Sequence, residues 1–388
     1  MRWIFLWLLV FPQFLQAQTS TKKWIQQAWL IDTHNDIISA CLEKNLAFDA
    51  DLLGKTHSDL NRMLKSGLDM QFFSVWCDEN QAKPYEWALK EINYLNDIIK
   101  KNPDKIILAG NYSDMKKAKK QHKLAAMFGV EGGHMLEEDI SRIDSFYAKG
   151  VRYLTLTWNN SNSWASSAMD ETQKPIQPKG LNEKGKQIVK RMNELGMLVD
   201  VSHVGEQTFY DVLATTTKPV IASHSSVYAI CPVFRNLKDE QIKAIAQNKG
   251  VIHINFYSGF LDSHFFANQK AFIAKHKIER DSLLKLNPVT AFADAHLFQK
   301  YADEVKNMRA AFSLLIDHIE YIVKLVGEDY VGIGSDFDGI SSTPKQIDDV
   351  TNYSLIAEAL LEKGYSKKAI KKIMGLNFLR VLQANEVP

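Results

Sequence analysis

Short runs of β-branched and aromatic residues recur along this chain, and longer amphipathic segments separate them. Each run has the length and composition of a buried strand, and helical periodicity lies between most of the runs. Strands that alternate with helices form parallel sheets with crossover helices, and eight such units predict a closed barrel. The eight runs cover residues 30–37, 70–76, 125–130, 152–158, 198–203, 219–224, 251–257 and 330–336.

The segment between the seventh and eighth runs, residues 258–328, is too long for a simple connection. It contains the amphipathic stretch "AFSLLIDHIEYIVKLVG", preceded by a charged helical stretch over residues 265–308. We therefore predict an α/β fold, a (β/α)8 TIM-like barrel with a helical excursion between strands 7 and 8. A doubly wound open sheet is the competing architecture. It would usually place a glycine-rich phosphate loop after the first strand, where this chain has "THNDIISA".

The N-terminus, "MRWIFLWLLVFPQFLQAQTS", has one positive charge, an apolar run and then small polar residues, which is the pattern of a signal peptide. The run is short for a membrane span and Pro12 interrupts it, so no membrane anchor is expected in the mature chain. We predict a signal peptide over residues 1–18, a single catalytic domain over residues 19–388, and a periplasmic or secreted protein.

Charge and cysteine content argue against a nucleic-acid partner and against a fold that depends on disulfides or on a cysteine metal site. Lys and Arg number 47 and Asp and Glu number 45, so the formal net charge of +2 gives no electrostatic case for a nucleic-acid partner. The cysteines are Cys41, Cys77 and Cys231. Three cysteines allow at most one intrachain disulfide, and none has metal-ligand spacing to another.

Six side chains that bind metals in proteins fall at the C-terminal ends of the expected strands: His34, Asp36, Glu131, His203, His224 and Asp336. In a barrel these strand ends meet at one rim, where active sites are built. His34 and Asp36, two residues apart, are expected on one face of the first strand. Asp338 likewise lies two residues from Asp336, so it would share a strand face with Asp336 and competes with it for the same place in the site.

Each of these residues also has an ordinary explanation when it is taken alone. A histidine at a strand end is often a satisfied core residue, and Asp36 is a plausible helix N-cap. Six chemically matched strand ends instead indicate a metal site. Because tetrahedral zinc needs four ligands, six residues suggest two ions that share a bridging carboxylate. The imidazoles favour zinc, and manganese and iron stay open.

Other polar groups carry less weight. Ser223 and Ser225 flank His224, but the chain has no G-x-S-x-G elbow, so serine catalysis is disfavoured. His134 and His253 are expected in the core or beside the ligands rather than as ligands.

The motifs resemble those of the membrane (renal) dipeptidases and their bacterial relatives in the amidohydrolase superfamily, and the chain looks like a bacterial-type secreted member. The matching stretches span nearly the whole mature chain in the order of the family. They are "DTHNDI", "GVEGG", "GVRYLTLTWN", "VDVSHVGEQTFYDVL", "PVIASHS", "RNL", "INFY", "VGIGSDFDG" and "GLNFLRVL".

This resemblance implies a site with two zinc ions. His34 and Asp36 would hold one ion, Glu131 would bridge, and His203 and His224 would hold the other. Asp336 would stand beside the metal-bound hydroxide. By the same match, Arg235 in "FRNL" would bind the free carboxylate of the substrate, and Tyr257 in "INFY" would be a further substrate contact.

The implied activity is zinc-dependent hydrolysis of the peptide bond of dipeptides, with L,D-dipeptides among the expected substrates. Two cations lower the pKa of a bridging water, so that a hydroxide attacks the polarised carbonyl. Catalytic roles fall to Asp336, which would carry the proton to the leaving amine, and to Glu131. A guanidinium fork suits Arg235 for binding a carboxylate.

One departure from the family bears on activity. The family commonly has "TLTH", with a histidine that binds substrate, whereas this chain has "TLTW" with Trp158. An indole offers one donor and does not titrate, so assistance to the oxyanion would be either lost or supplied by Asn159 or Asn160. Trp158 and Asn159 are therefore expected to contact substrate. The alternatives are another binuclear amidohydrolase, acting on an N-acyl amino acid or a lactam, or a catalytically weakened metal-binding barrel. Whether the chain forms a homodimer stays open.

Overall fold

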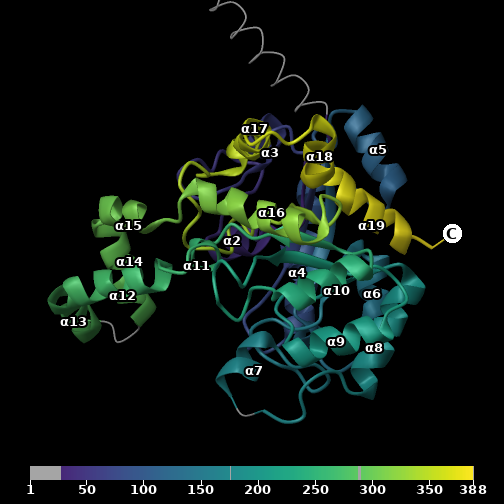
Figure 1. Ribbon diagram of the computed structural model, residues 1–388, viewed down its shortest axis with the longest axis horizontal. Helices are drawn as coiled ribbons and strands as arrows, with labels where there is room; N and C mark the ends of the chain where they lie inside the picture. Colours follow the sequence, from purple (N-terminus) through teal and green to yellow (C-terminus); the bar gives the residue numbers. More distant parts are fainter. Residues whose placement is uncertain (1–27, 175, 287–289, 388) are drawn as a thin grey trace, which may run out of the picture.

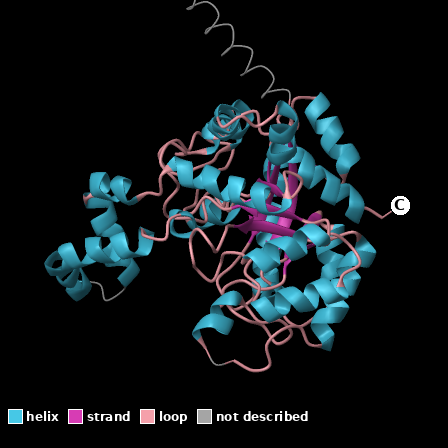
Figure 2. Ribbon diagram, in the orientation of Figure 1, coloured by secondary structure: helices cyan, strands magenta, loops and turns pink. Residues whose placement is uncertain are grey.

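The computed structural model (Figure 1) describes residues 28–174, 176–286 and 290–387. The predicted signal peptide, residues 1–18, lies outside the described residues. Within them, parallel strands form a nearly closed eight-stranded barrel that helices surround (Figure 2), which confirms the predicted (β/α)8 fold. Every helix of this part of the chain is too short or too polar to cross a bilayer.

The barrel strands follow one another in chain order, and each pairs in parallel with the next. The closing seam lies between the last strand and the first, where Thr33 N donates to Ile333 O over 3.1 Å. All eight predicted strands are present. They are β1 (Ile31–Asp32), β2 (Met70–Val75), β4 (Leu124–Glu131), β5 (Val151–Thr155), β6 (Leu198–Asp200), β7 (Ile221–Ser225), β8 (Val251–Ile254) and β9 (Val331–Ile333).

A short additional strand, β3 (Ile106–Leu108), is not predicted by the sequence pattern. It pairs with residues 124–126 of β4, on the edge that β5 leaves uncovered because β5 begins opposite Phe128. Three residues are too few to show a period of two, which is why the pattern misses this strand.

Alternation along the strands builds two layers inside the barrel. The lower layer is apolar and includes Met70, Phe72, Met127, Tyr153, Leu198 and Ile221, with Phe378 of α19 (Asn377–Asn385) against it. The next inward positions carry polar side chains, which we call the polar layer: Ser74, Glu131, Thr155, Asp200 and Ser223. All five are buried. The polar layer therefore lies between an apolar floor and the C-terminal rim of the barrel.

Helices cover the outside of the barrel (Figure 2). They are α2 (Ile37–Glu43), α3 (Leu60–Lys65), α4 (Pro84–Lys101), α5 (Tyr112–Lys120), α6 (Arg142–Ala148), α7 (Ala168–Gln173), α8 (Glu183–Leu195), α9 (Glu206–Thr215), α10 (Asp239–Gln247), α17 (Ser354–Glu362) and α18 (Lys367–Lys371), which a π-helical turn joins to α19. Local sequence fixes α8 well. The Asn182 side chain caps its first N–H groups, and Gly196 ends it in the left-handed conformation.

The predicted excursion between the seventh and eighth barrel strands is also confirmed. Helices α12 (Phe265–Lys275), α13 (Lys277–Leu286), α14 (Thr290–Lys300) and α15 (Ala302–Met308) project from the barrel, at the left of Figure 1. Helix α11 (Ser258–Leu261) leads into this excursion and α16 (Phe312–Val326) follows it. The two helices contact each other, and α16 also contacts α10 and β9.

Candidate active site

Two of the side chains predicted as ligands, Glu131 and His224, lie on strands β4 and β7, and the others follow their strands. The prediction that His34 and Asp36 share one strand face is wrong, because β1 ends at Asp32 and Asp36 immediately precedes α2. His203 and Asp336 likewise follow their strands, and both adopt the left-handed backbone conformation, with φ of 64° and 61°. Such conformations are uncommon outside glycine and concentrate at functional sites.

Two strand residues and the turns that follow other strands therefore bring together the ligand set that the sequence predicts. His34 Nε2 lies 3.3 Å from Asp36 Oδ2 and 3.4 Å from Glu131 Oε2. On the other side, Glu131 Oε1 lies 2.8 Å from His203 Nε2 and 3.3 Å from His224 Nε2. The two oxygens of Glu131 thus face different pairs, His34 with Asp36 and His203 with His224. The pairs adjoin, since ligand atoms of His34, Glu131 and His224 lie within 4.8 Å of one another.

These residues fit two metal ions. Zinc bonds of about 2.0–2.1 Å in a tetrahedral arrangement place neighbouring ligand atoms roughly 3.3 Å apart. The contacts within the two groups run from 2.8 to 3.4 Å. In addition, His34 Nε2 and Asp36 Oδ2 are buried without a hydrogen-bond partner among the described residues. Burying such atoms is costly unless something else, such as a cation, satisfies them.

The electrostatics of the cluster favour bound cations. Burial lowers the pKa of His203 to about 4, with the positive charge of Arg235 adding to the effect. Burial, followed by nearby His34, lowers the pKa of His224 well below its ordinary value. Both imidazoles are thus neutral near pH 7 and keep a lone pair for a metal. Burial also opposes a charge on His34, yet Tyr153, Asp36 and Glu131 raise its pKa well above the ordinary value.

Each histidine predicted as a ligand has a polar partner at its second ring nitrogen. His34 Nδ1 lies 2.7 Å from the Tyr153 hydroxyl, and His203 Nδ1 lies 3.2 Å from Asn159 Oδ1. His224 Nδ1 lies 2.8 Å from Ser223 Oγ. Such partners orient metal-binding imidazoles. Sequence reasoning missed this role for all three, although Tyr153 and Ser223 sit at inward strand positions where a period of two would place them.

Tyr153 also explains a glycine of the "FGVE" motif. A Cβ built at Gly129 would lie 1.9 Å from the Tyr153 ring, so the ring occupies the space of any side chain there. Gly129 is therefore required for the contact between Tyr153 and His34.

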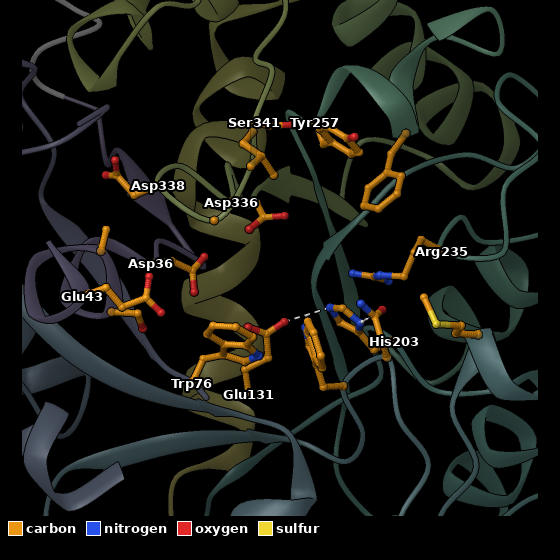
Figure 3. Close-up of a pocket in the computed structure, with 18 of the residues that line it drawn as sticks. Asp36, Glu43, Trp76, Glu131, His203, Arg235, Tyr257, Asp336, Asp338 and Ser341 are labelled. Atoms are coloured by element: carbon orange, nitrogen blue, oxygen red, sulfur yellow. Dashed lines mark hydrogen bonds and ion pairs between the residues drawn. The ribbon is translucent and has the colours of Figure 1, made fainter. Parts of the chain in front are cut away.

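A cavity of about 520 Å³ opens over the cluster (Figure 3) and suits a small ligand. Its walls include Asp36, Glu131, His203 and Asp336, together with all four residues predicted to contact substrate: Arg235, Tyr257, Trp158 and Asn159. Glu43, Lys44 and Trp76 also line it and were not predicted. Asn160 is not among the lining residues, so of the two asparagines only Asn159 faces the cavity.

Arg235 is a buried cation without an anionic partner. It is 4% exposed, and no carboxylate of the described residues forms an ion pair with it. Its Nη2 donates to His224 O over 3.2 Å, while its Nε has no partner in this part of the chain. Burial lowers its pKa to about 10. A guanidinium held in this way at a cavity wall calls for an anionic ligand.

The structure distinguishes the two competing aspartates. Asp336 Oδ1 lies 4.0 Å from His34 Nε2, and Asp336 Oδ2 accepts a hydrogen bond from Asn255 Nδ2 over 2.7 Å. Asp338 instead accepts hydrogen bonds from Ser58 Oγ and His57 N. Asp336 therefore has an oxygen directed at the cluster, whereas the oxygens of Asp338 are used in holding a neighbouring loop.

The remaining candidates lie outside the cluster. His134 Nε2 is 3.1 Å from Cys77 O, and His253 Nδ1 is 3.0 Å from Ala222 O. Cys41, Cys77 and Cys231 are buried free thiols. Trp158 packs edge-on against Trp76, with ring centroids 5.0 Å apart, at the wall beside His203.

Sequence comparison places this arrangement among known proteins. The family model described as membrane dipeptidase, peptidase family M19, matches residues 18–387. An uncharacterized dipeptidase of Schizosaccharomyces pombe is 30% identical over 390 residues, which cover 96% of this chain and 84% of the relative.

Solved structures share the fold. The probable dipeptidase PvdM of Pseudomonas aeruginosa has a TM-score of 0.77 at 24% identity, covering 95% of this chain and 98% of its own. A metallo peptidase of Rhodobacter sphaeroides, liganded with a phosphinate mimic of the dipeptide L-Ala-D-Ala, has a TM-score of 0.75 at 21% identity. That match covers 92% of this chain and 99% of the other.

We predict that zinc stabilises the folded chain through this cluster. A ligand that binds only the native state adds roughly 4 kcal/mol when its free concentration is about a thousand times its dissociation constant. Calorimetry of chelator-treated protein, with and without added zinc, should show a higher Tm with zinc. Glu131→Gln should abolish the increase. Glu91→Gln, a buried acid on α4 that accepts from Ser39 Oγ, should keep it. An unchanged Tm in the wild type would contradict the prediction.

Proposed function

Because this chain belongs to the membrane dipeptidase family, peptidase family M19, and is a metallo-dipeptidase, we propose that it hydrolyses free dipeptides with two zinc ions. His34 and Asp36 would hold one ion and His203 and His224 the other, with Glu131 between them. The imidazoles and the spacing of the ligand atoms support zinc.

The observation that carries the choice of substrate is Arg235. A dipeptide differs from an internal peptide segment by its free carboxylate, which lies one residue from the scissile bond. Arg235 is a buried guanidinium with an unpartnered Nε at the wall of the cavity that contains Glu131 and Asp336. A carboxylate bound there would place the peptide bond over the cluster. Figure 3 shows Arg235 on the His203 side of the cavity and Glu43 on the Asp36 side.

Two divalent ions at this position would supply an acidified water as nucleophile and positive charge beside the scissile carbonyl. Proton transfer falls to Asp336, which Asn255 holds by a hydrogen bond. It takes the proton of the attacking water and delivers it to the leaving amine. Burial, followed by nearby Asp36, raises the pKa of Asp336 well above its ordinary value, which suits a carboxyl that must hold a proton.

Two finer points belong to the same proposal. The Rhodobacter structure holds a mimic of L-Ala-D-Ala, and this supports L,D-dipeptides as substrates here. The signal-peptide pattern of residues 1–18 supports export to the periplasm or the medium.

We predict that Arg235→Met removes the preference for a free carboxylate. Leaving a buried charge partner unpaired costs about 2–5 kcal/mol, so kcat/KM for a dipeptide should fall about 30- to 4,000-fold. Hydrolysis of the matching dipeptide amide should change little, because the amide carries no charge for Arg235 to bind. Steady-state kinetics on both substrates measures the difference.

The control is Arg380→Met. Arg380 donates to Gly250 O and Asp329 O, just before β8 and β9 begin and thus at the opposite end of the barrel. The Arg380→Met variant should keep the preference for the dipeptide over its amide. Equal losses on dipeptide and amide in Arg235→Met would contradict the assigned role of Arg235.

We also predict that Trp158→His raises activity on ordinary dipeptides. The substitution restores the family residue and replaces the indole by a smaller imidazole that both donates and titrates, and a single well-placed oxyanion donor is worth about 10²- to 10³-fold in kcat. Trp76→His, the same change in the ring that packs against Trp158, is the control and should give no gain. No change or a fall in Trp158→His would show that Trp158 belongs to a distinct, working site.

A further inference from the structure

Beneath the histidine pair, Asp200 accepts four hydrogen bonds. It is fully buried in the polar layer. Its Oδ1 accepts from Ser223 N over 2.8 Å and from Ser202 N over 3.0 Å, which fixes the orientation of the carboxylate. Its Oδ2 accepts from Ser223 Oγ and from Thr155 Oγ1, both over 2.6 Å. Asp200 therefore acts only as an acceptor.

This arrangement determines the direction of the next hydrogen bond. Ser223 Oγ has one proton, which it donates in its hydrogen bond to Asp200 Oδ2. Toward His224 Nδ1, 2.8 Å away, Ser223 Oγ can therefore only accept. The Nδ1 atom of His224 must carry the ring proton, and the lone pair remains on Nε2, which faces Glu131 Oε1.

An irregularity in β7 makes the chain of contacts possible. The register of β7 against β8 shifts between Ala222 and Ser225. Neighbouring residues of a regular strand point to opposite faces, whereas a bulge re-aims a side chain. Ser223 and His224 can thus both reach the interior side, where their side chains meet.

The other two histidines lack a comparable carboxylate. Asn159, beside His203, is an amide that presents either an acceptor or a donor when its end group turns over. The Tyr153 hydroxyl, beside His34, has no second hydrogen-bond partner among the described residues, so its proton can point either way. Of the three predicted histidine ligands, only His224 has its tautomer fixed by an acidic residue.

We propose that Asp200 and Ser223 are positioning residues that lock His224 in the tautomer with the proton on Nδ1 and so preform the position of the ion between His203 and His224. This inference rests on the metal centre of the proposed function. It assigns a task to two buried residues that the hydrolytic reaction itself does not use.

The test is zinc binding by the full chain, with zinc ions alone as the probe. Ser223→Ala removes the acceptor of the His224 proton. Loss of such a partner typically weakens metal binding 10- to 100-fold, so the affinity for one of two zinc ions should fall by about that factor. Titration against a competing chelator, with elemental analysis, should show the other ion retained. Ser226→Ala is the matched control, since Ser226 is also buried and its Oγ has no partner in this part of the chain.

Asp200→Asn tests the direction of the chain. The amide nitrogen would take the place of Oδ2 and donate to Ser223 Oγ, whose own proton would then be donated to His224 Nδ1. The ring proton would move to Nε2, so one zinc ion should again bind about 10- to 100-fold more weakly. Unlike Ser223→Ala, the single variant Ser223→Thr keeps the hydroxyl, so it should bind both zinc ions with the affinity of the wild type. If Asp200 and Ser223 had a merely structural role, their substitution would instead lower the Tm of the metal-free protein and weaken the binding of both zinc ions alike.

The outcomes separate this inference from the proposed function. Two zinc ions bound equally well by the wild type, Ser223→Ala and Asp200→Asn would contradict the lock and leave the proposed function intact. Absence of zinc binding in the wild type would contradict both.

Discussion

Glu131 is the constraint around which the rest of the site is arranged. It is a buried carboxylate whose two oxygens face different pairs of side chains, so it joins them into a single cluster. Burial works against its charge, and three histidines nonetheless hold its pKa well below the ordinary value. An arrangement of this kind is stable only when positive charge compensates the carboxylates. The two cations proposed above would meet that demand at the spacings that the ligand atoms already have.

The barrel supplies this cluster with a rigid support. Its lower interior is filled by apolar side chains, and the polar layer above contributes Glu131 directly and Asp200 and Ser223 from beneath. The turns at the strand ends then add His34, Asp36 and His203. In the proposed function the substrate binds at the cavity wall, where Arg235 is a buried charge without an ion-pair partner among the described residues.

Much of the fold could be predicted from the sequence because buried parallel strands leave runs of β-branched and aromatic residues. The strand ends were placed too late at His34, His203 and Asp336, since local composition does not show where strand pairing stops and a left-handed turn begins. The predicted ligand set could be found because its residue types are chemically distinctive.

Tyr153 and Asp200 were missed because a single buried tyrosine or aspartate within a strand resembles an ordinary core residue until its partner on the neighbouring strand is known. Arg235 was identified through family resemblance alone, since its lack of an ion partner is visible only in three dimensions.

The central claim is that one carboxylate joins two metal ions at the rim of this barrel. A crystal structure of the zinc-loaded protein, with anomalous diffraction collected at the zinc edge, tests it most directly. We predict two anomalous peaks that flank Glu131, one beside His34 and Asp36 and the other beside His203 and His224. A single peak, or peaks away from Glu131, would contradict the account.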